Sequence, residues 1–104
     1  MQILVNTDST VQGGDHLSER YHARVEQAIA RFSDRITRVE VHLGDDNKAK
    51  GGSDDKHCTI EARIAGMQPL AVSAEGGSLD QAVDGAADKL HRAIDSALGR
   101  LRDG

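Results

Sequence analysis

The single cysteine of the chain, Cys58, stands next to His57, and an adjacent histidine could activate a thiol as a nucleophile. Neighbouring residues of a strand point to opposite faces of a sheet, so these two side chains would not meet. Cys58 shares the phase of Ile60 in a segment where apolar and polar residues alternate, and this predicts a buried thiol. We therefore expect Cys58 to be an inert core residue.

Metal binding is the second chemistry that the histidines and acidic residues could supply. His42 and His57 are expected to face solvent on adjacent strands, but two imidazoles lack the third and fourth ligands that zinc takes. The aspartates of the segment 45–55 lack the EF-hand spacing and its closing glutamate. The sequence therefore predicts no metal site and no cofactor. The remaining histidines are expected on helix surfaces: His16, His22 and His91.

Gly13 and Gly14 precede a predicted helix, as the glycines of a phosphate-binding loop do. The lysine of the G-x-x-x-x-G-K-[ST] pattern is missing, and the spacing does not match G-x-G-x-x-G. Asp15, which follows them, would repel a phosphate. Because no pair of convergent catalytic groups stands out, we expect a protein that is not an enzyme and has no small-molecule substrate.

The basic residues offer another chemistry, the binding of phosphate groups. At roughly 100° per residue, three arginines of the segment 16–33 fall within about 40° of one another, beside its apolar stripe. The C-terminal segment also has its cations, residues 89, 92 and 100, along one edge of a predicted helix. Its aspartates 84, 88 and 95 lie along another edge. Pairs of opposite charge four residues apart would interleave the signs on one face, whereas here the signs are segregated.

This segregation predicts a phosphate-binding surface made of two basic flanks, about one helix spacing or 8–10 Å apart. The alternative interpretation is that these charges only solvate two helices. The residues predicted to bind phosphates, and through them RNA if the partner is a nucleic acid, are Arg20, Arg24, Arg31, Lys89, Arg92 and Arg100.

Composition limits the classes of partner. The chain has 104 residues and a net charge of -4, which argues against nucleic-acid binding unless the cations are gathered in one place. Its two aromatic residues, Tyr21 and Phe32, supply no platform for stacking bases. No apolar run approaches the roughly 18 residues of a membrane span, and no signal peptide is visible. A single cysteine is typical of a reducing cytoplasm.

The hydrophobic pattern predicts six elements in the order β-α-β-β-β-α. A strand-helix-strand crossover is right-handed and makes the first two strands parallel, and the others form antiparallel hairpins. We therefore expect one α+β domain over 1–104, a two-layer sandwich with a four-stranded mixed sheet and two parallel helices on one face, similar to double-stranded-RNA-binding domains. The expected elements are strands over 1–8, 38–43, 58–64 and 70–75, a helix over 16–33 with Asp15 as N-cap, and a helix after the N-cap Ser78, with a loop over 44–55 and a turn over 66–69.

The C-terminal run 73–90 resembles the ribosome hibernation promoting factor family, also called ribosome-associated inhibitor or sigma-54 modulation proteins. The resemblance is carried by a strand, Glu-Gly, a capped helix, the triplet Ala82-Val83-Asp84, and Asp88-Lys89-Leu90. The segment 33–36 and the alternating strand 39–43 extend it, so that it covers nearly the whole chain.

The resemblance implies a short, single-domain, non-catalytic and cytoplasmic factor. Such a factor binds the small ribosomal subunit along the mRNA and tRNA channel through 16S rRNA phosphates, and blocks translation in stationary phase or under stress. The family's basic positions on the second helix match Lys89, Arg92 and Arg100, whereas Ser96 and Leu98 stand where the family has lysines.

An alternative remains open beside this function. The net charge of -4 and the missing lysines are also consistent with a divergent member that serves as a protein-interaction or regulatory module without ribosome binding. The sequence does not indicate the oligomeric state.

Overall fold

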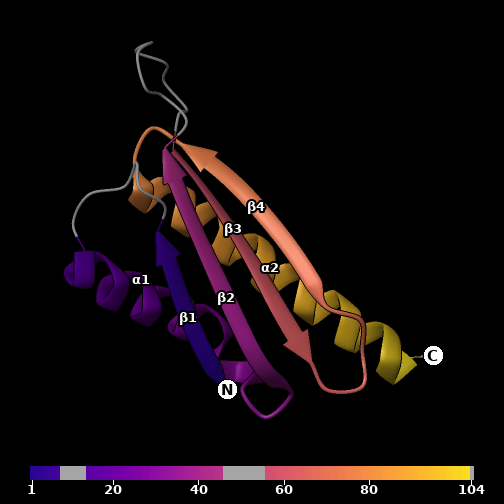
Figure 1. Cartoon of the computed structure of the whole chain (residues 1–104). Coiled ribbons are helices and arrows are strands. Elements are labelled where there is room, and N and C mark those ends of the chain that lie inside the picture. The colour runs from indigo at the N-terminus through magenta and orange to yellow at the C-terminus, as the bar shows by residue number, and fades with distance from the viewer. Residues whose placement is uncertain (8–13, 46–55, 104) are drawn as a thin grey trace.

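A computed structural model of the chain describes residues 1–7, 14–45 and 56–103. Its element order confirms the predicted β-α-β-β-β-α arrangement, with one short 3-10 helix added (Figure 1). The elements are β1 (Gln2–Thr7), α1 (Gly14–Ile29), η1 (Ala30–Phe32), β2 (Ile36–Asp45), β3 (Lys56–Ile64), β4 (Leu70–Gly76) and α2 (Leu79–Asp103).

The four strands form one sheet in the order β1-β2-β3-β4. β1 pairs with β2 in parallel, and the two hairpin pairs are antiparallel, as predicted. Both helices lie on the same face of the sheet, with α1 packed on β1 and α2 on β3 and β4 (Figure 1). The two-layer sandwich is thus confirmed, and no described helix or strand covers the other face of the sheet, which we call the uncovered face. Among the described residues, no helix has the length and apolarity needed to cross a bilayer.

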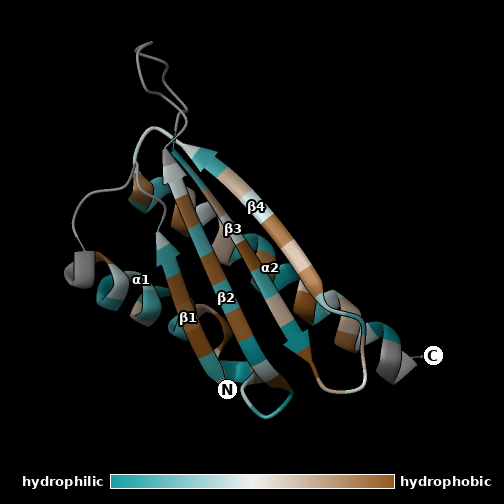
Figure 2. Ribbon diagram, in the orientation of Figure 1, coloured by the Kyte–Doolittle hydropathy of each residue, from teal (hydrophilic) through white to brown (hydrophobic). Residues whose placement is uncertain are grey.

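The core is an aliphatic layer between the sheet and the helices. Apolar and polar residues alternate along the strands, so each strand turns one apolar row toward the helices (Figure 2). Val39 and Val41 on β2 are fully buried, as are Leu90 and Ile94 on α2. β1 is less buried than its apolar run suggests: Ile3 is buried, but Leu4 and Val5 are only partly so, because β1 is an edge strand.

The first helix differs from the prediction at both ends. α1 already includes Gly14, so Asp15 lies inside its first turn rather than at the N-cap. The α-helix ends at Ile29 and not at Ser33, because the chain tightens into the 3-10 turn η1, closed by a bond from Ser33 N to Ala30 O. This turn buries Phe32 beneath the helices.

The second helix begins as predicted. Ser78 Oγ accepts a hydrogen bond from Gln81 N at 3.1 Å, which confirms the N-cap. The Gln81 side chain accepts a bond from Gly77 N at 2.9 Å, so the turn after β4 is held from both sides. The predicted loop begins two residues late, because β2 continues through Asp45; residues 46–55 of that loop lie outside the described residues.

Two glycines, one at the end of β4 and one near the C-terminal end of α2, differ in the space around them. A Cβ on Gly76 would lie 2.7 Å from Gln81 Cβ and 3.0 Å from Ala82 N, whereas a Cβ on Gly99 in α2 would meet nothing within 4 Å. Gly76→Ala should therefore lower the free energy of unfolding by about 1–3 kcal/mol. Gly99→Ala should raise it by about 0.5–1 kcal/mol, because alanine favours a helix. Urea denaturation measures both, and shifts of the same sign would contradict this packing.

Candidate nucleic-acid interface

The three predicted arginines of α1 and η1 point toward α2 and pair with its aspartates. Residue numbers increase together along the pairs, as they must between parallel helices. We call these contacts the interhelical ladder. Its pairs are Arg20–Asp80 at 2.5 Å, Arg24–Asp84 at 2.7 Å, Arg24–Asp88 at 3.7 Å and Arg31–Asp95 at 3.5 Å.

The ladder corrects the expected geometry of the phosphate-binding surface. Instead of two neighbouring basic flanks, the basic flank of α1 faces the acidic flank of α2. Three arginines meet four aspartates, so the ladder carries one net negative charge. Its side chains are 34–68% exposed, and each such pair contributes at most about 1 kcal/mol to stability. Guanidinium groups that already face carboxylates are weak sites for a phosphate.

A signal for this pairing is present in the sequence. The arginines 20, 24 and 31 repeat at spacings of four and seven, and the aspartates 84, 88 and 95 repeat at the same spacings. These matching spacings account for the pairs Arg24–Asp88 and Arg31–Asp95. They do not account for the pairs one helical turn earlier, Arg20–Asp80 and Arg24–Asp84. Charge segregation within each helix, taken alone, does not distinguish this arrangement from an RNA-binding surface.

Asp80 closes one end of the ladder by accepting two donors. Tyr21 Oη donates to Asp80 Oδ1 at 2.7 Å, and Arg20 binds the other oxygen of the same carboxylate. Burial of the phenol, followed by its bond to Asp80, raises the pKa of Tyr21 to about 12. Tyr21 is therefore a fixed donor at neutral pH, and its ring belongs to the core.

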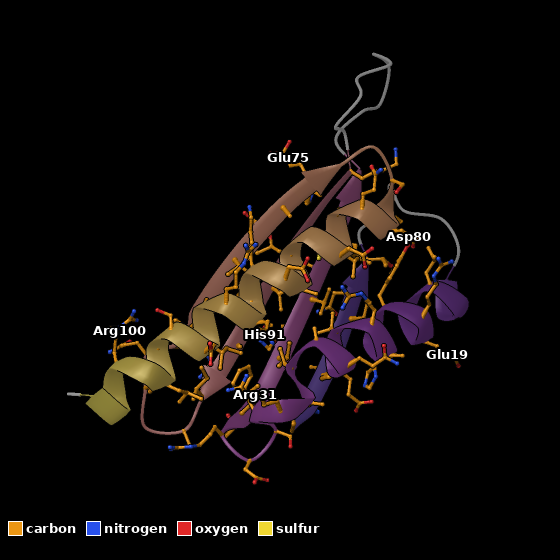
Figure 3. All side chains as sticks on the ribbon, turned by 180° about the vertical axis from the view of Figure 1, so that it is seen from behind. Glu19, Arg31, Glu75, Asp80, His91 and Arg100 are labelled. Atoms are coloured by element: carbon orange, nitrogen blue, oxygen red, sulfur yellow. The ribbon has the colours of Figure 1, made fainter. Side chains whose placement is uncertain are left out.

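His91 lies between the helices and not on the surface where the sequence placed it. Its Nδ1 is 2.8 Å from Ala28 O, and its ring centroid is 5.1 Å from that of Phe32. A bond to a carbonyl oxygen requires a proton on Nδ1, so His91 donates from α2 to the backbone of α1. In Figure 3, His91 and Arg31 both occupy the seam between the two helices, and Asp80 lies at its other end.

The predicted cations of α2 take no part in the described contacts between the two helices. Lys89 Nζ donates to Ser73 O of the edge strand β4 at 2.8 Å, and Arg100 Nη1 donates to Ser96 Oγ at 3.0 Å. The side chain of Arg92 is exposed. We call Lys89, Arg92 and Arg100 the outer basic flank. None of the three forms an ion pair with another residue in 1–7, 17–45 or 56–100.

The cysteine is buried, as predicted. Cys58 is 0% exposed, and burial raises the pKa of its thiol to about 12. A neutral, covered thiol is neither a nucleophile nor a metal ligand at physiological pH.

Comparison with known proteins points to one family. The family model for sigma 54 modulation protein / S30EA ribosomal protein matches residues 10–102. A ribosomal subunit interface protein from Coxiella burnetii has a similar structure, with a TM-score of 0.71, 19% identity and coverage of 95% of this chain and 99% of that one. The Protein Y N-terminal domain from Thermus thermophilus gives a TM-score of 0.60 at 21% identity, covering 89% of this chain and 91% of that one. No curated protein sequence gives a significant match.

The state of Cys58 can be measured directly. At pH 8 the folded protein should react with iodoacetamide at least about a hundredfold more slowly than the urea-unfolded chain, because both burial and the raised pKa suppress the thiolate. Since the folded pKa lies above the usual value, this group's contribution to stability is present below about pH 8.5 and falls as the pH rises toward 12. Equal rates for the folded and unfolded chains would contradict the buried position.

Proposed function

The chain belongs to the sigma 54 modulation protein / S30EA ribosomal protein family, and from this premise we propose that it is a ribosome hibernation factor that acts without catalysis. It binds the small ribosomal subunit along the mRNA and tRNA channel and excludes both RNAs by occupying their space. It acts in the cytoplasm, in stressed or stationary-phase cells. The observation that carries this proposal is the family match over residues 10–102.

The outer basic flank is the contact surface that we propose for 16S rRNA. Phosphate contacts supply most of the sequence-independent affinity for nucleic acids, and they require cations that no carboxylate already neutralises. Lys89, Arg92 and Arg100 meet this requirement among the described residues, because none of them is part of the interhelical ladder. They lie along one helix, so they can follow a phosphate backbone.

Recognition relies on the shape of the RNA and not on its bases. The two aromatic rings, those of Tyr21 and Phe32, are 4% and 5% exposed, so neither can stack on a splayed base. Side-chain contacts to phosphates position a protein on RNA but carry no sequence information. A channel of fixed shape is a suitable target for such a surface.

The arginines of α1 make a secondary contact in this proposal. Arg20 and Arg31 are each 64% exposed, and a guanidinium has five N–H donors, so both retain donors that face solvent beside their aspartate partners. Arg24 is 34% exposed and has two aspartates within 4 Å, which leaves it less available. The net negative charge of the ladder makes this contact weaker than that of the outer basic flank.

A second candidate function is a protein-interaction module without ribosome binding. It is favoured by the ladder, which neutralises three of the six predicted RNA-binding cations on a chain whose net charge is -4. The two candidates differ in their response to salt, because only phosphate binding releases condensed counterions.

Sedimentation with purified small subunits tests the proposal. The wild-type protein should co-sediment with the subunits at about 50 mM salt, and the co-sedimenting fraction should fall steeply as salt rises to about 200 mM. Arg92→Glu should weaken association by about tenfold or more and make the salt dependence shallower, since it removes one phosphate contact and adds a repulsive charge. Its midpoint of thermal unfolding should stay near that of the wild type, because Arg92 is exposed.

A matched control separates local contact from net charge. Arg63→Glu changes the total charge by the same amount, but Arg63 lies on β3 with its side chain on the uncovered face of the sheet. It should bind small subunits as the wild type does. If Arg92→Glu binds no worse than Arg63→Glu, the outer basic flank is not the contact surface. If the wild type does not co-sediment even at low salt, the protein-interaction module is the better function.

A further inference from the structure

The uncovered face of the sheet brings three side chains with metal-binding atoms together. Glu40 and His42 come from β2, and Glu61 comes from β3. One ligand atom of each lies within 4.8 Å of the others. The sequence pairs His42 only with His57 and predicts no metal site. His57 is not part of this cluster, which contains two glutamates instead.

Strand geometry explains why these residues meet. Glu40 and His42 are two residues apart and therefore point to the same face of β2. The β2–β3 register makes Glu61 the direct cross-strand neighbour of Glu40. Two like charges directly opposite each other on adjacent strands destabilise a sheet unless a cation lies between them.

An arginine of the protein offsets part of the repulsion between the two glutamates. Arg38 Nη2 binds Glu40 Oε1 at 2.7 Å, which leaves the second oxygen of Glu40 free to face the imidazole. His42 Nε2 lies 3.9 Å from Glu40 Oε2 and 3.7 Å from Glu61 Oε1. One guanidinium balances one of the two carboxylates and holds Glu40 in a fixed orientation, as outer-sphere partners of metal ligands do. The imidazole nitrogen thus stands between two carboxylate oxygens.

We propose that Glu40, His42 and Glu61 form a binding site for a divalent transition metal ion. One imidazole and two carboxylates match the nitrogen and oxygen ligands that Zn²⁺ takes, with water in the fourth position. Ligand atoms in a tetrahedral zinc site are about 3.3 Å apart. The distances from His42 Nε2 to the two carboxylate oxygens, 3.7 and 3.9 Å, can shorten to this value through small side-chain rotations. The three side chains are 32–52% exposed and are free to make such rotations.

The site is independent of the proposed ribosome contact. The outer basic flank is on α2, and both helices cover the opposite face of the sheet (Figure 1). Loss of metal binding would leave the proposed function untouched, and loss of ribosome binding would leave the metal site untouched.

Calorimetric titration with ZnCl₂ tests the site on the full chain. The wild type should bind one equivalent. His42→Gln should lower the affinity at least about tenfold, because the glutamine replaces the only nitrogen ligand. His57→Gln is the matched control, since it removes a histidine from the same face of the sheet but not from the cluster, and it should bind as the wild type does. If the wild type does not bind Zn²⁺, or if His42→Gln binds equally well, the proposal is wrong.

Thermal unfolding separates lost ligands from lost structure. Without metal, Glu61→Gln should be at least as stable as the wild type, because it removes one of two opposed negative charges. Saturating Zn²⁺ should raise the midpoint of unfolding of the wild type and of His57→Gln, since a ligand stabilises the state that binds it. It should raise the midpoints of Glu61→Gln and His42→Gln by clearly less, because both variants bind the ion more weakly. Equal zinc-induced shifts in all four proteins would overturn the assignment.

Discussion

Burial of an aliphatic layer between one face of the sheet and two helices decides where the charged groups of this protein lie. Val25 and Ile29 on α1, and Leu90 and Ile94 on α2, are fully buried, so neither helix is free to rotate about its axis. With these stripes fixed on the sheet, the flank of α1 that carries arginines faces α2, and the flank of α2 that carries aspartates faces α1. The parallel crossover between β1 and β2 adds the remaining constraint, because it makes the two helices run in the same direction and keeps the pairs in step.

The interhelical ladder matters more for charge distribution than for stability. Its pairs are exposed, and exposed ion pairs contribute little free energy. They do offset the positive charge of the arginines between the helices, so the described helical cations that remain outside the ladder lie on α2. A net charge of -4 is therefore compatible with a local anion-binding surface, because part of the acidity is used within the protein. Position, and not total charge, determines what this surface attracts.

The fold could be predicted because it depends on periodicity within single segments. The period of two in Val39, Val41 and Leu43 and the helical spacing after Ser78 each require one partner layer, and a crossover has one allowed hand. The site depends on relations between segments, which such patterns do not contain. The pairing of Arg31 with Asp95 needs the rotation of both helices, and the meeting of Glu40 with Glu61 needs the register of two strands. His91 was misplaced for the same reason, because its position on α2 faces α1.

The outer basic flank also differs along its own length. Lys89 donates to Ser73 O, a carbonyl on the open edge of β4, and a lysine there keeps this edge from pairing with another strand. If a phosphate binds the ammonium group, the carbonyl of Ser73 can accept a hydrogen bond from water instead. Little free energy is lost, because this carbonyl lies at an exposed edge. In the proposed contact with rRNA, Lys89 would thus serve the free protein and the bound state in turn. Arg92 has no hydrogen bond or ion pair to another described residue to give up, so within the outer basic flank it is the position where a phosphate would meet the least competition.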